Sequence, residues 1–325
     1  MRDAPLAFDY DHLSLAPRHA SGLPHRADAR PGVSLGPAVL EVPLVGSPMP
    51  DVCGPRMCQA LAGAGALGIL HRFESIEQQA QQVRELASAT EKPAAAALGV
   101  TGDWQERFLA LLDAGCSIFC LDTANGAHTQ VGRAIDWIRG RDSSAFLIAG
   151  NVASAEGFHW LEEHGADAIR VGIAGGSVCE TRTETAVYVP TPYAVAEAAS
   201  VRTRALIIGD GGIRMPADLC KLLALGADLA MVGSALAGTD EAPGRTIAVD
   251  GKTFKIMRGA ASFSVQQEAG NLDPQYVEGA ETLVPAKGPA QGVVRRYLAG
   301  LRSSMAYLNA RTLDEYRANA SFVRL

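Results

Sequence analysis

The segment AFLIAGNVASAEGFHWLEEHGADAIRVG, residues 145–172, contains the repeating unit that decides the fold. A short apolar run at 145–150 is followed by a helix-like stretch at 154–165 and by a second apolar run at 167–172. This alternation is typical of a strand–helix–strand unit in a parallel sheet. The helix-like stretch ends in Gly165, as helices commonly do.

The same alternation extends along most of the chain. Six further apolar runs lie at 41–46, 66–71, 93–100, 117–123, 205–210 and 229–234, and further helix-like stretches lie at 75–90, 103–115, 129–140 and 215–226. Eight β/α repeats in about 200 residues fit a closed (β/α)₈ barrel, whereas an open doubly wound sheet more often has about five or six strands. We therefore predict an α/β fold, a (β/α)₈ TIM barrel. We expect residues 1–325 to form a single domain, with an active-site loop region at about 259–290 and a C-terminal extension.

Composition limits the classes of function. The 325 residues are 48% hydrophobic and 20% charged, which is typical of a folded globular chain and excludes disorder and collagen. A net charge of -6 argues against nucleic acid as a partner. The six cysteines lack C-x-x-C spacing, the N-terminus lacks an export signal, and no apolar run is long enough to cross a membrane. We expect a reduced, cytoplasmic protein with no membrane partner.

The chemistry of such a barrel is located at the carboxyl ends of its strands. The loop after the sixth predicted strand, GGSVCETRTE (175–184), carries Cys179 and Thr181. A thiolate at this face can act as a covalent nucleophile, and the threonine can relay a proton. A cysteine taken at random is more often an inert buried side chain. The glycine-rich polar loop favours the catalytic interpretation, so Cys179 is the strongest candidate in the chain.

The loops after the last three strands are rich in glycine and serine. Their main-chain N–H groups and hydroxyls can hold a phosphate, through Ser177, Gly211, Gly212, Gly233 and Ser234. Each glycine taken alone is equally well explained as a turn residue. Asp210, which ends the seventh strand, can accept hydrogen bonds from a ribose diol, or it can be a cap or turn residue. Together they predict a nucleoside monophosphate as ligand.

Longer segments closely resemble the IMP dehydrogenase/GMP reductase family. They are FDYDHLSLAPR (8–18), VPLVGSPM (42–49), IAGNVASAEG (148–157), IRVGIAGGSVCETR (169–182), the block 207–244 and the C-terminal region from KGP (287–289) to Leu325. The resemblance runs nearly end to end. It implies a (β/α)₈ barrel, purine-nucleotide chemistry, a nicotinamide cofactor and a homotetramer.

The resemblance also implies roles for individual residues. Cys179 matches the nucleophile that adds to purine C2, Thr181 matches the catalytic threonine, and Asp210 matches the ribose-binding aspartate. The residues that match phosphate contacts are Ser177, Gly212, Gly233 and Ser234. Those that match the substrate pocket are Ser47, Met49, Gly211, Arg258, Gly259 and Ala260, and those that match the segment facing the nicotinamide are Asp122, Ala124, Asn125 and Gly126.

Four features favour the reductase branch of the family. No regulatory CBS modules interrupt the chain between the second and third strands, and residues 259–290 lack the Arg-Tyr pair with which dehydrogenases hydrolyse their intermediate. Glu278 matches a glutamate that handles ammonia, with Glu281 as a less favoured substitute, and the segment 124–126 has the reductase form. The resemblance therefore implies an NADPH-dependent GMP reductase that converts GMP to IMP and ammonia through a covalent Cys179 intermediate.

Some residues depart from the family pattern. Glu180 stands where threonine is common, Met257 where a phosphate-binding tyrosine is usual, Thr191 where a glutamine is usual, and the loop 174–177 lacks a proline. Three alternatives stay open: a purine-nucleotide oxidoreductase of altered specificity, an IMP dehydrogenase, or a weakly active nucleotide-binding homologue. NADH in place of NADPH also stays open. A monovalent cation such as K⁺ at the glycine-rich loop 172–177 would use main-chain carbonyls, so no side chain is assigned to a metal.

Overall fold

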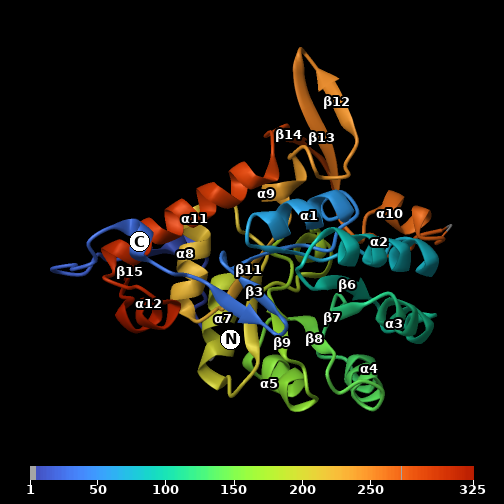
Figure 1. Ribbon diagram of the computed structural model, residues 1–325, viewed down its shortest axis with the longest axis horizontal. Coiled ribbons are helices and arrows are strands. Elements are labelled where there is room, and N and C mark those ends of the chain that lie inside the picture. Colours follow the sequence, from blue (N-terminus) through green and yellow to red (C-terminus); the bar gives the residue numbers. More distant parts are fainter. Residues whose placement is uncertain (1–4, 272) are drawn as a thin grey trace.

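The computed structural model describes residues 5–271 and 273–325, and its centre is a barrel of eight parallel strands (Figure 1). The strands are β4 (Leu44–Gly46), β5 (Leu67–Gly68), β6 (Ala94–Leu98), β7 (Cys116–Asp122), β8 (Phe146–Val152), β9 (Ala168–Val171), β10 (Leu206–Asp210) and β11 (Leu229–Val232). Their spatial order is β5-β4-β11-β10-β9-β8-β7-β6. A parallel bridge between Leu70 and Ala96 joins β5 to β6 and closes the ring. The prediction of a (β/α)₈ barrel and of all eight strands is confirmed.

Helices surround the barrel and cover its outer face (Figure 1). They are α1 (Pro55–Gly63), α2 (Ile76–Ala89), α3 (Trp104–Asp113), α4 (Thr129–Arg139), α5 (Ala155–Glu163), α7 (Thr191–Val201) and α8 (Pro216–Leu225). In α4 the residues Val131, Ile135 and Ile138 are buried, at the spacing that places them on one helix face. The chain passes from β5 to α2 within residues 69–75, with no further domain between them.

A hairpin closes one end of the barrel. The strands β2 (Val33–Leu35) and β3 (Ala38–Leu40) pair in antiparallel fashion and bring Leu35 and Leu40 into the same buried cluster as the inward-facing strand residues Ile118 and Ile208. Gly36 in the turn lies against the ring of Phe146, at the start of β8. The hairpin therefore covers the amino ends of the strands, which leaves the carboxyl ends as the open face.

A three-stranded antiparallel sheet projects from the barrel (Figure 1). It consists of β12 (Thr246–Val249), β13 (Lys252–Arg258) and β14 (Glu281–Pro285), and it was not predicted. The region 259–290, expected to be a loop, contains β14 and the helix α10 (Phe263–Glu268). Most side chains of β12 and β14 are exposed, so they lack the alternation of apolar and polar residues that marks a half-buried strand. The Asp250-Gly251 turn, with positive φ at both residues, is the hairpin signal that could have been used.

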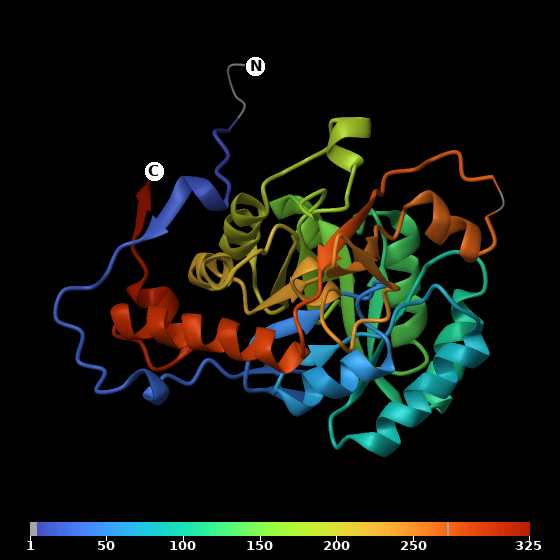
Figure 2. The same ribbon diagram turned by 90° about the horizontal axis from the view of Figure 1, so that it is seen from above.

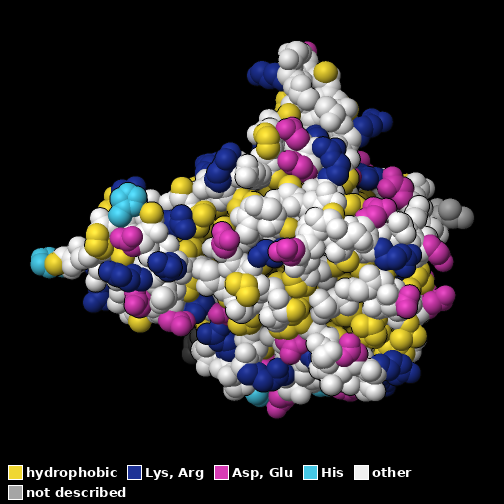
Figure 3. All heavy atoms as spheres, in the orientation of Figure 1, with side chains coloured by type: hydrophobic (Ala, Val, Ile, Leu, Met, Phe, Trp, Pro, Cys, Tyr) yellow, Lys and Arg dark blue, Asp and Glu magenta, His cyan; other side chains and the backbone are white. Residues whose placement is uncertain are grey.

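The two ends of the described chain are paired. Strand β1 (Leu13–Leu15) runs antiparallel to β15 (Phe322–Arg324), and Figure 2 shows these two segments beside each other at one side of the molecule. Before β15, α11 (Ala290–Tyr307) and α12 (Leu313–Asn319) pack on α8. On the face shown in Figure 3, Lys and Arg side chains are interspersed with Asp and Glu. Among the described helices, none is both long enough and apolar enough to span a membrane.

Candidate active site

The predicted nucleophile and its partner lie beside each other in the loop after β9. The Sγ of Cys179 donates to Oγ1 of Thr181 at 3.2 Å. Thr181 is the first residue of the short helix α6 (Thr181–Thr185), and Glu180 precedes it as the N-cap. The structure therefore brings a thiol and a hydroxyl into direct contact.

Cys179 differs from the other cysteines in its exposure. All six cysteines lie in the described residues, and the five others are buried. Burial raises the pKa of Cys116 to about 12 and that of Cys120 and Cys220 to about 11, which keeps these thiols protonated and unreactive. Cys179 is partly exposed at the open face of the barrel, so it is the thiol that a ligand at this face can reach.

The main chain around Glu278 lies directly against the nucleophile loop. Cys179 forms an antiparallel bridge with Gly279, and the Glu180 N–H donates to the Glu278 carbonyl at 2.8 Å. The two segments approach closely at Gly259. If a Cβ were added to this glycine, it would lie only 2.7 Å from the Val178 carbonyl oxygen. The structure thus brings Glu278 and Gly259, both predicted from the sequence, against the main chain of the Cys179 segment.

Two predicted aspartates are joined through a buried arginine that the sequence interpretation missed. Arg170 on β9 donates from Nη1 to Asp122 Oδ1 at 2.6 Å, and from Nη2 and Nε to Asp210 Oδ2 at 2.9 and 3.1 Å. Asn151 adds a bond of 2.8 Å to the same oxygen of Asp210, and Arg72 contacts Oδ2 of Asp122 at 3.3 Å. The five side chains form one network across the mouth of the barrel.

The charges in this network balance each other. Burial opposes ionisation of Asp122, but the nearby guanidinium groups of Arg170 and Arg72 outweigh it and lower the pKa of this carboxyl. An arginine inside a strand whose residues are all buried needs such partners, since an unpaired buried charge is very costly. This pattern in DAIRVG (167–172) is the sequence signal that could have identified Arg170.

The turns after β9 and β10 touch each other. A Cβ on Gly211 would lie 3.1 Å from the Cα of Gly175, and Gly211 and Gly212 have φ of +101° and +75°, a conformation that favours glycine. Ser177 is exposed in the adjoining loop. Thr191, the first residue of α7, is buried, and its hydroxyl donates to the Asp210 carbonyl at 3.3 Å. These contacts place Ser177 and the Gly-Gly turn at the same face as Asp210.

A second group of predicted residues gathers at the end of β11. A Cβ added to Gly233 would lie 3.4 Å from Met49 Sδ, 3.6 Å from Met257 Cε and 3.8 Å from Ser47 Cβ. Ser234 begins the short helix α9 (Ser234–Ala237) beside it. The structure brings together Ser47, Met49, Gly233 and Ser234, and it places Met257 among them.

The segment predicted to face a nicotinamide follows β7. Ala124 and Asn125 are exposed, whereas Gly126 is buried and its N–H donates to the Asn151 carbonyl at 2.7 Å. Thr123 Oγ1 also donates to the Gly150 carbonyl at 2.7 Å. The segment is therefore fixed on the end of β8, with two of its residues open to solvent.

Arg258 does not offer its charge to a ligand. Its guanidinium binds both carboxylate oxygens of Asp51, at 2.8 and 2.9 Å, and Oε1 of Glu268 at 2.7 Å. The Arg258 main-chain N–H also donates to Oδ2 of Asp51, at 2.9 Å, so this structure does not support the prediction that Arg258 binds substrate through its guanidinium or its N–H. Ala260, two residues further along the chain, is partly exposed.

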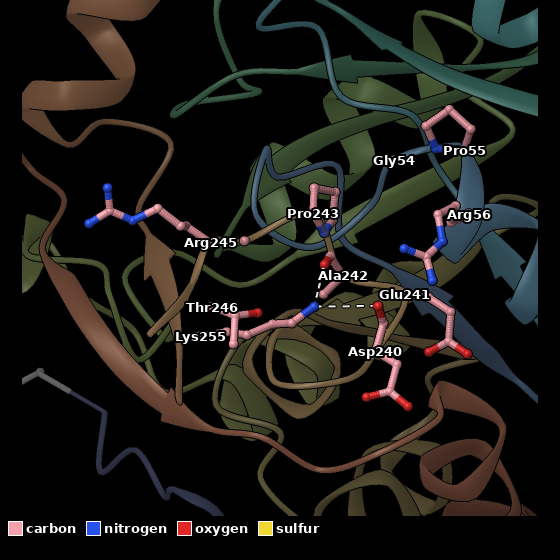
Figure 4. A pocket seen from close by; sticks show the side chains of 11 residues that line it. Gly54, Pro55, Arg56, Asp240, Glu241, Ala242, Pro243, Arg245, Thr246 and Lys255 are labelled. Carbon is pink, nitrogen blue, oxygen red and sulfur yellow. Dashed lines mark hydrogen bonds between the residues drawn. The ribbon is translucent and has the colours of Figure 1, made fainter. Parts of the chain in front are cut away.

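A cavity of about 500 Å³ lies outside this site (Figure 4). It is bounded by the start of α1, residues 240–246 and Lys255 of β13. The Lys255 Nζ donates to the carbonyls of Ala242 and Asp240, at 2.6 and 3.4 Å. None of the predicted site residues lines the cavity. The predicted site and the cavity therefore lie on different parts of the surface.

A family model and similar curated proteins identify the same family. The profile of the IMP dehydrogenase / GMP reductase domain matches residues 7–325. Inosine-5'-monophosphate dehydrogenases of Aquifex aeolicus and Streptococcus pyogenes are each 41% identical to the chain, over 240 and 246 residues and 71% of its length. The chain spans 49% of the length of each of these relatives.

A solved structure matches over the whole chain. A cysteine-to-alanine variant of GMP reductase from Trypanosoma brucei, in complex with guanosine 5'-monophosphate, has a TM-score of 0.95 and 26% sequence identity. The match covers 100% of this chain and 96% of the other. The sequence relatives are thus named as dehydrogenases and the solved structure as a reductase, which are two members of the one family.

Proposed function

The chain belongs to the IMP dehydrogenase/GMP reductase family of oxidoreductases, and we propose that within it the protein is a GMP reductase. The proposed reaction is the NADPH-dependent reductive deamination of GMP to IMP and ammonia. The observation that carries the proposal is the contact of Cys179 Sγ with Thr181 Oγ1 at 3.2 Å, beside the main chain of Glu278. The GMP bound by the Trypanosoma brucei structure supports the same ligand class.

The proposed chemistry is a covalent exchange at C2 of the purine. The Cys179 thiolate forms an S–C2 bond, and the C2–N bond to the amino group breaks, so that ammonia leaves with protons supplied through Thr181 and Glu278. A hydride then adds to C2 and the C–S bond breaks, which returns the thiolate and releases IMP. The balance is one GMP, one reduced nicotinamide and two protons consumed, with one IMP, one oxidised nicotinamide and one ammonium ion formed.

Substrate binding is assigned to the glycine-rich turns and Asp210. We place the phosphate at the N–H groups and hydroxyls of Ser177, Gly212, Gly233 and Ser234. The ribose faces the Asp210 carboxylate, because all three bonds that the structure gives this group go to Oδ2 and leave Oδ1 for a diol. Ser47, Met49 and Ala260 line the base and sugar.

The residues after β7 fit a nicotinamide. Ala124 and Asn125 are exposed beside the Arg170 network, and the segment is fixed through Gly126, so an aromatic ring can stack there without reordering the loop. When bound, NADPH supplies the hydride. Asp122 acts by holding Arg170 and Arg72, since each of its oxygens accepts a bond from one of them. A K⁺ ion would be held by main-chain carbonyls of the loop 172–177.

An IMP dehydrogenase is the second candidate, since the 41% identical relatives carry that name. A dehydrogenase must hydrolyse its covalent intermediate, for which the family uses an Arg-Tyr pair near the nucleophile. The Arg296-Tyr297 pair of this chain lies in α11, and Tyr297 is only 2% exposed. This placement favours the reductase. We also propose that the protein is a cytoplasmic homotetramer.

In the direct test, purified protein is mixed with GMP and NADPH. The loss of reduced nicotinamide and the release of ammonia are both measured. The proposal would be supported if the amount of ammonia released equals the amount of NADPH oxidised, and if Cys179→Ala shows no turnover. Turnover only with IMP and NAD⁺ would identify a dehydrogenase. Binding of GMP without turnover in either direction would identify a nucleotide-binding homologue, and reduction of another purine nucleotide would indicate altered specificity.

A further inference from the structure

Two adjacent residues near the N-terminus contact two separate loops of the site. Asp9 accepts a hydrogen bond from the Tyr188 hydroxyl at 2.7 Å, between its Oδ2 and the phenol oxygen. Tyr10 donates from its own hydroxyl to the Gly211 carbonyl at 2.9 Å. The Asp9 carboxylate also accepts the main-chain N–H of Tyr10 at 2.7 Å, which fixes the Asp9 side chain against the main chain of its neighbour.

Tyr188 closes the loop that carries the nucleophile. Its neighbour Val189 pairs with Ile173 in an antiparallel bridge, so residues 174–188 form a loop with a fixed base. The guanidinium of Arg182 lies 4.4 Å above the Tyr188 ring, and Arg182 directly follows Thr181. The bond from Tyr188 to Asp9 is therefore the outer attachment of the segment that begins at Thr181.

Tyr10 supports the turn that follows Asp210. Its side chain is buried, and a Cβ on Gly212 would lie 2.8 Å from Tyr10 Cε2. Burial raises the pKa of Tyr10 well above its usual value, and the charges of Asp218, Asp9 and Asp210 act in the same direction, so the phenol stays a hydrogen-bond donor. The ring and the hydroxyl together fix the main chain of the Gly211-Gly212 turn.

The segment that carries both residues is itself anchored. The Lys221 Nζ donates to the Tyr10 carbonyl at 2.7 Å. The β1–β15 pairing follows immediately, and the Leu325 N–H donates to the His12 carbonyl at 3.0 Å. Asp9 and Tyr10 lie at the start of a 3-10 helix (Tyr10–His12) that leads directly into this ladder, so the segment is held on its carboxyl side.

We propose that Asp9 and Tyr10 are positioning residues that set the nucleophile loop in place relative to the phosphate-binding turn. This inference rests on the proposed GMP reductase function. Tyr188 and Asp9 act on the chemical step, because they hold the segment of Thr181. Tyr10 acts on substrate binding, because it holds Gly211 and Gly212. The two halves of the dipeptide therefore affect different kinetic constants.

The test compares Tyr188→Phe and Tyr10→Phe, which each remove one hydroxyl and keep the ring, with Tyr307→Phe, an exposed tyrosine of α11, as the matched control. Loss of one hydrogen bond corresponds to about fivefold in an equilibrium. We expect Tyr188→Phe to speed amide hydrogen exchange in residues 181–188 by about fivefold and to lower kcat with little change in KM for GMP. Tyr10→Phe should raise KM for GMP by about fivefold with little change in kcat.

The exchange measurement needs no turnover, so it separates this inference from the proposed function. Faster exchange at 181–188 in Tyr188→Phe but not in Tyr307→Phe, in a protein that does not reduce GMP, would support the attachment and refute only the reductase. Unchanged exchange and unchanged kinetic constants in an active reductase would overturn the inference. Equal changes in kcat and KM for both variants would also overturn it, because they would indicate general destabilisation.

Discussion

The guanidinium of Arg170 binds the carboxylate of Asp210 through two nitrogens that share one oxygen, with Nε at 3.1 Å and Nη2 at 2.9 Å from Oδ2. The same guanidinium uses Nη1 for Asp122. A planar group with donors in a fixed fork suits this double contact, which a lysine could not make. Arg170 therefore fixes the orientation in which Asp210 presents its other oxygen to the open face of the barrel.

Replacement of Arg170 with methionine should destabilise the protein. Arg170 is buried between two carboxylates, and its loss would leave Asp122 and Asp210 close together without their shared counter-charge. Breaking a buried pair in this way costs about 3–5 kcal/mol of unfolding free energy. Urea titration measures the change. Arg133→Met on the exposed face of α4 is the control and should stay within about 0.5 kcal/mol of the parent. A small effect of Arg170→Met would show that the network contributes little to stability.

Replacement of Thr181 with valine should slow the chemical step. The change keeps the shape of the side chain but removes the hydroxyl that lies 3.2 Å from Cys179 Sγ. A positioned proton-transfer group contributes about 10²- to 10⁴-fold to the rate, so kcat for GMP should fall by this factor. Thr183→Val, on an exposed position of the same helix, should keep most of its activity. Equal rates for the two variants would remove Thr181 from the mechanism.

Neutralising Glu180 should make Cys179 more reactive. Glu180 is adjacent to the nucleophile and precedes α6, so its carboxylate places a negative charge close to the sulfur that reacts. We expect Glu180→Gln to increase the rate of Cys179 alkylation by iodoacetamide at neutral pH by about two- to fivefold. Glu184→Gln, one turn further along, is the charge-matched control and should change the rate less. A slower reaction in Glu180→Gln would mean that the carboxylate assists the thiol instead.

His71 should make the fold sensitive to mild acid. It lies after β5, and burial lowers the pKa of His71 to about 4, although Asp51 acts in the opposite direction. Below the unfolded value of about 6.5 the unfolded chain takes up a proton that folded His71 does not, so stability is lost as pH falls from about 6.5 towards 4. Between about pH 7.5 and pH 5 this loss amounts to about 2 kcal/mol.

The measurement is the unfolding free energy at both pH values in the parent and in His71→Asn. The variant should lose about 2 kcal/mol less than the parent on acidification. His19→Asn, at an exposed position, should follow the parent. If the parent and His71→Asn lose the same free energy, His71 is protonated in the folded protein as easily as in the unfolded chain.

The barrel could be predicted because its signals are local. Each strand is an apolar run of a few residues, and each helix such as α4 repeats its buried positions within 11 residues, so both periods are visible without knowledge of distant contacts. The projecting sheet was missed for the opposite reason. Residues of β12 and β14 are largely exposed, and the pairing of β14 with β13 brings together chain segments that are not adjacent.

Site residues that contact each other within a short stretch of the chain could also be predicted from the sequence. Cys179 and Thr181 are two residues apart, so their contact follows from the loop itself. The role of Arg258 could not be foreseen, because its partner Asp51 is 207 residues away and removes its charge from the site. The sequence alone does not distinguish an arginine that is exposed to solvent from one that is paired with a distant carboxylate.

The sequence by itself determined the eight strands, five of the surrounding helices and the family, because hydrophobic periodicity and contiguous motifs are properties of short stretches. Only the tertiary structure decided which charges meet. Arg170 reaches Asp122 across 48 residues and Asp210 across 40, and Asp9 reaches Tyr188 across 179. These contacts depend on the strand order and register of the closed barrel, since side-chain pairing is short-ranged in space and independent of distance along the chain.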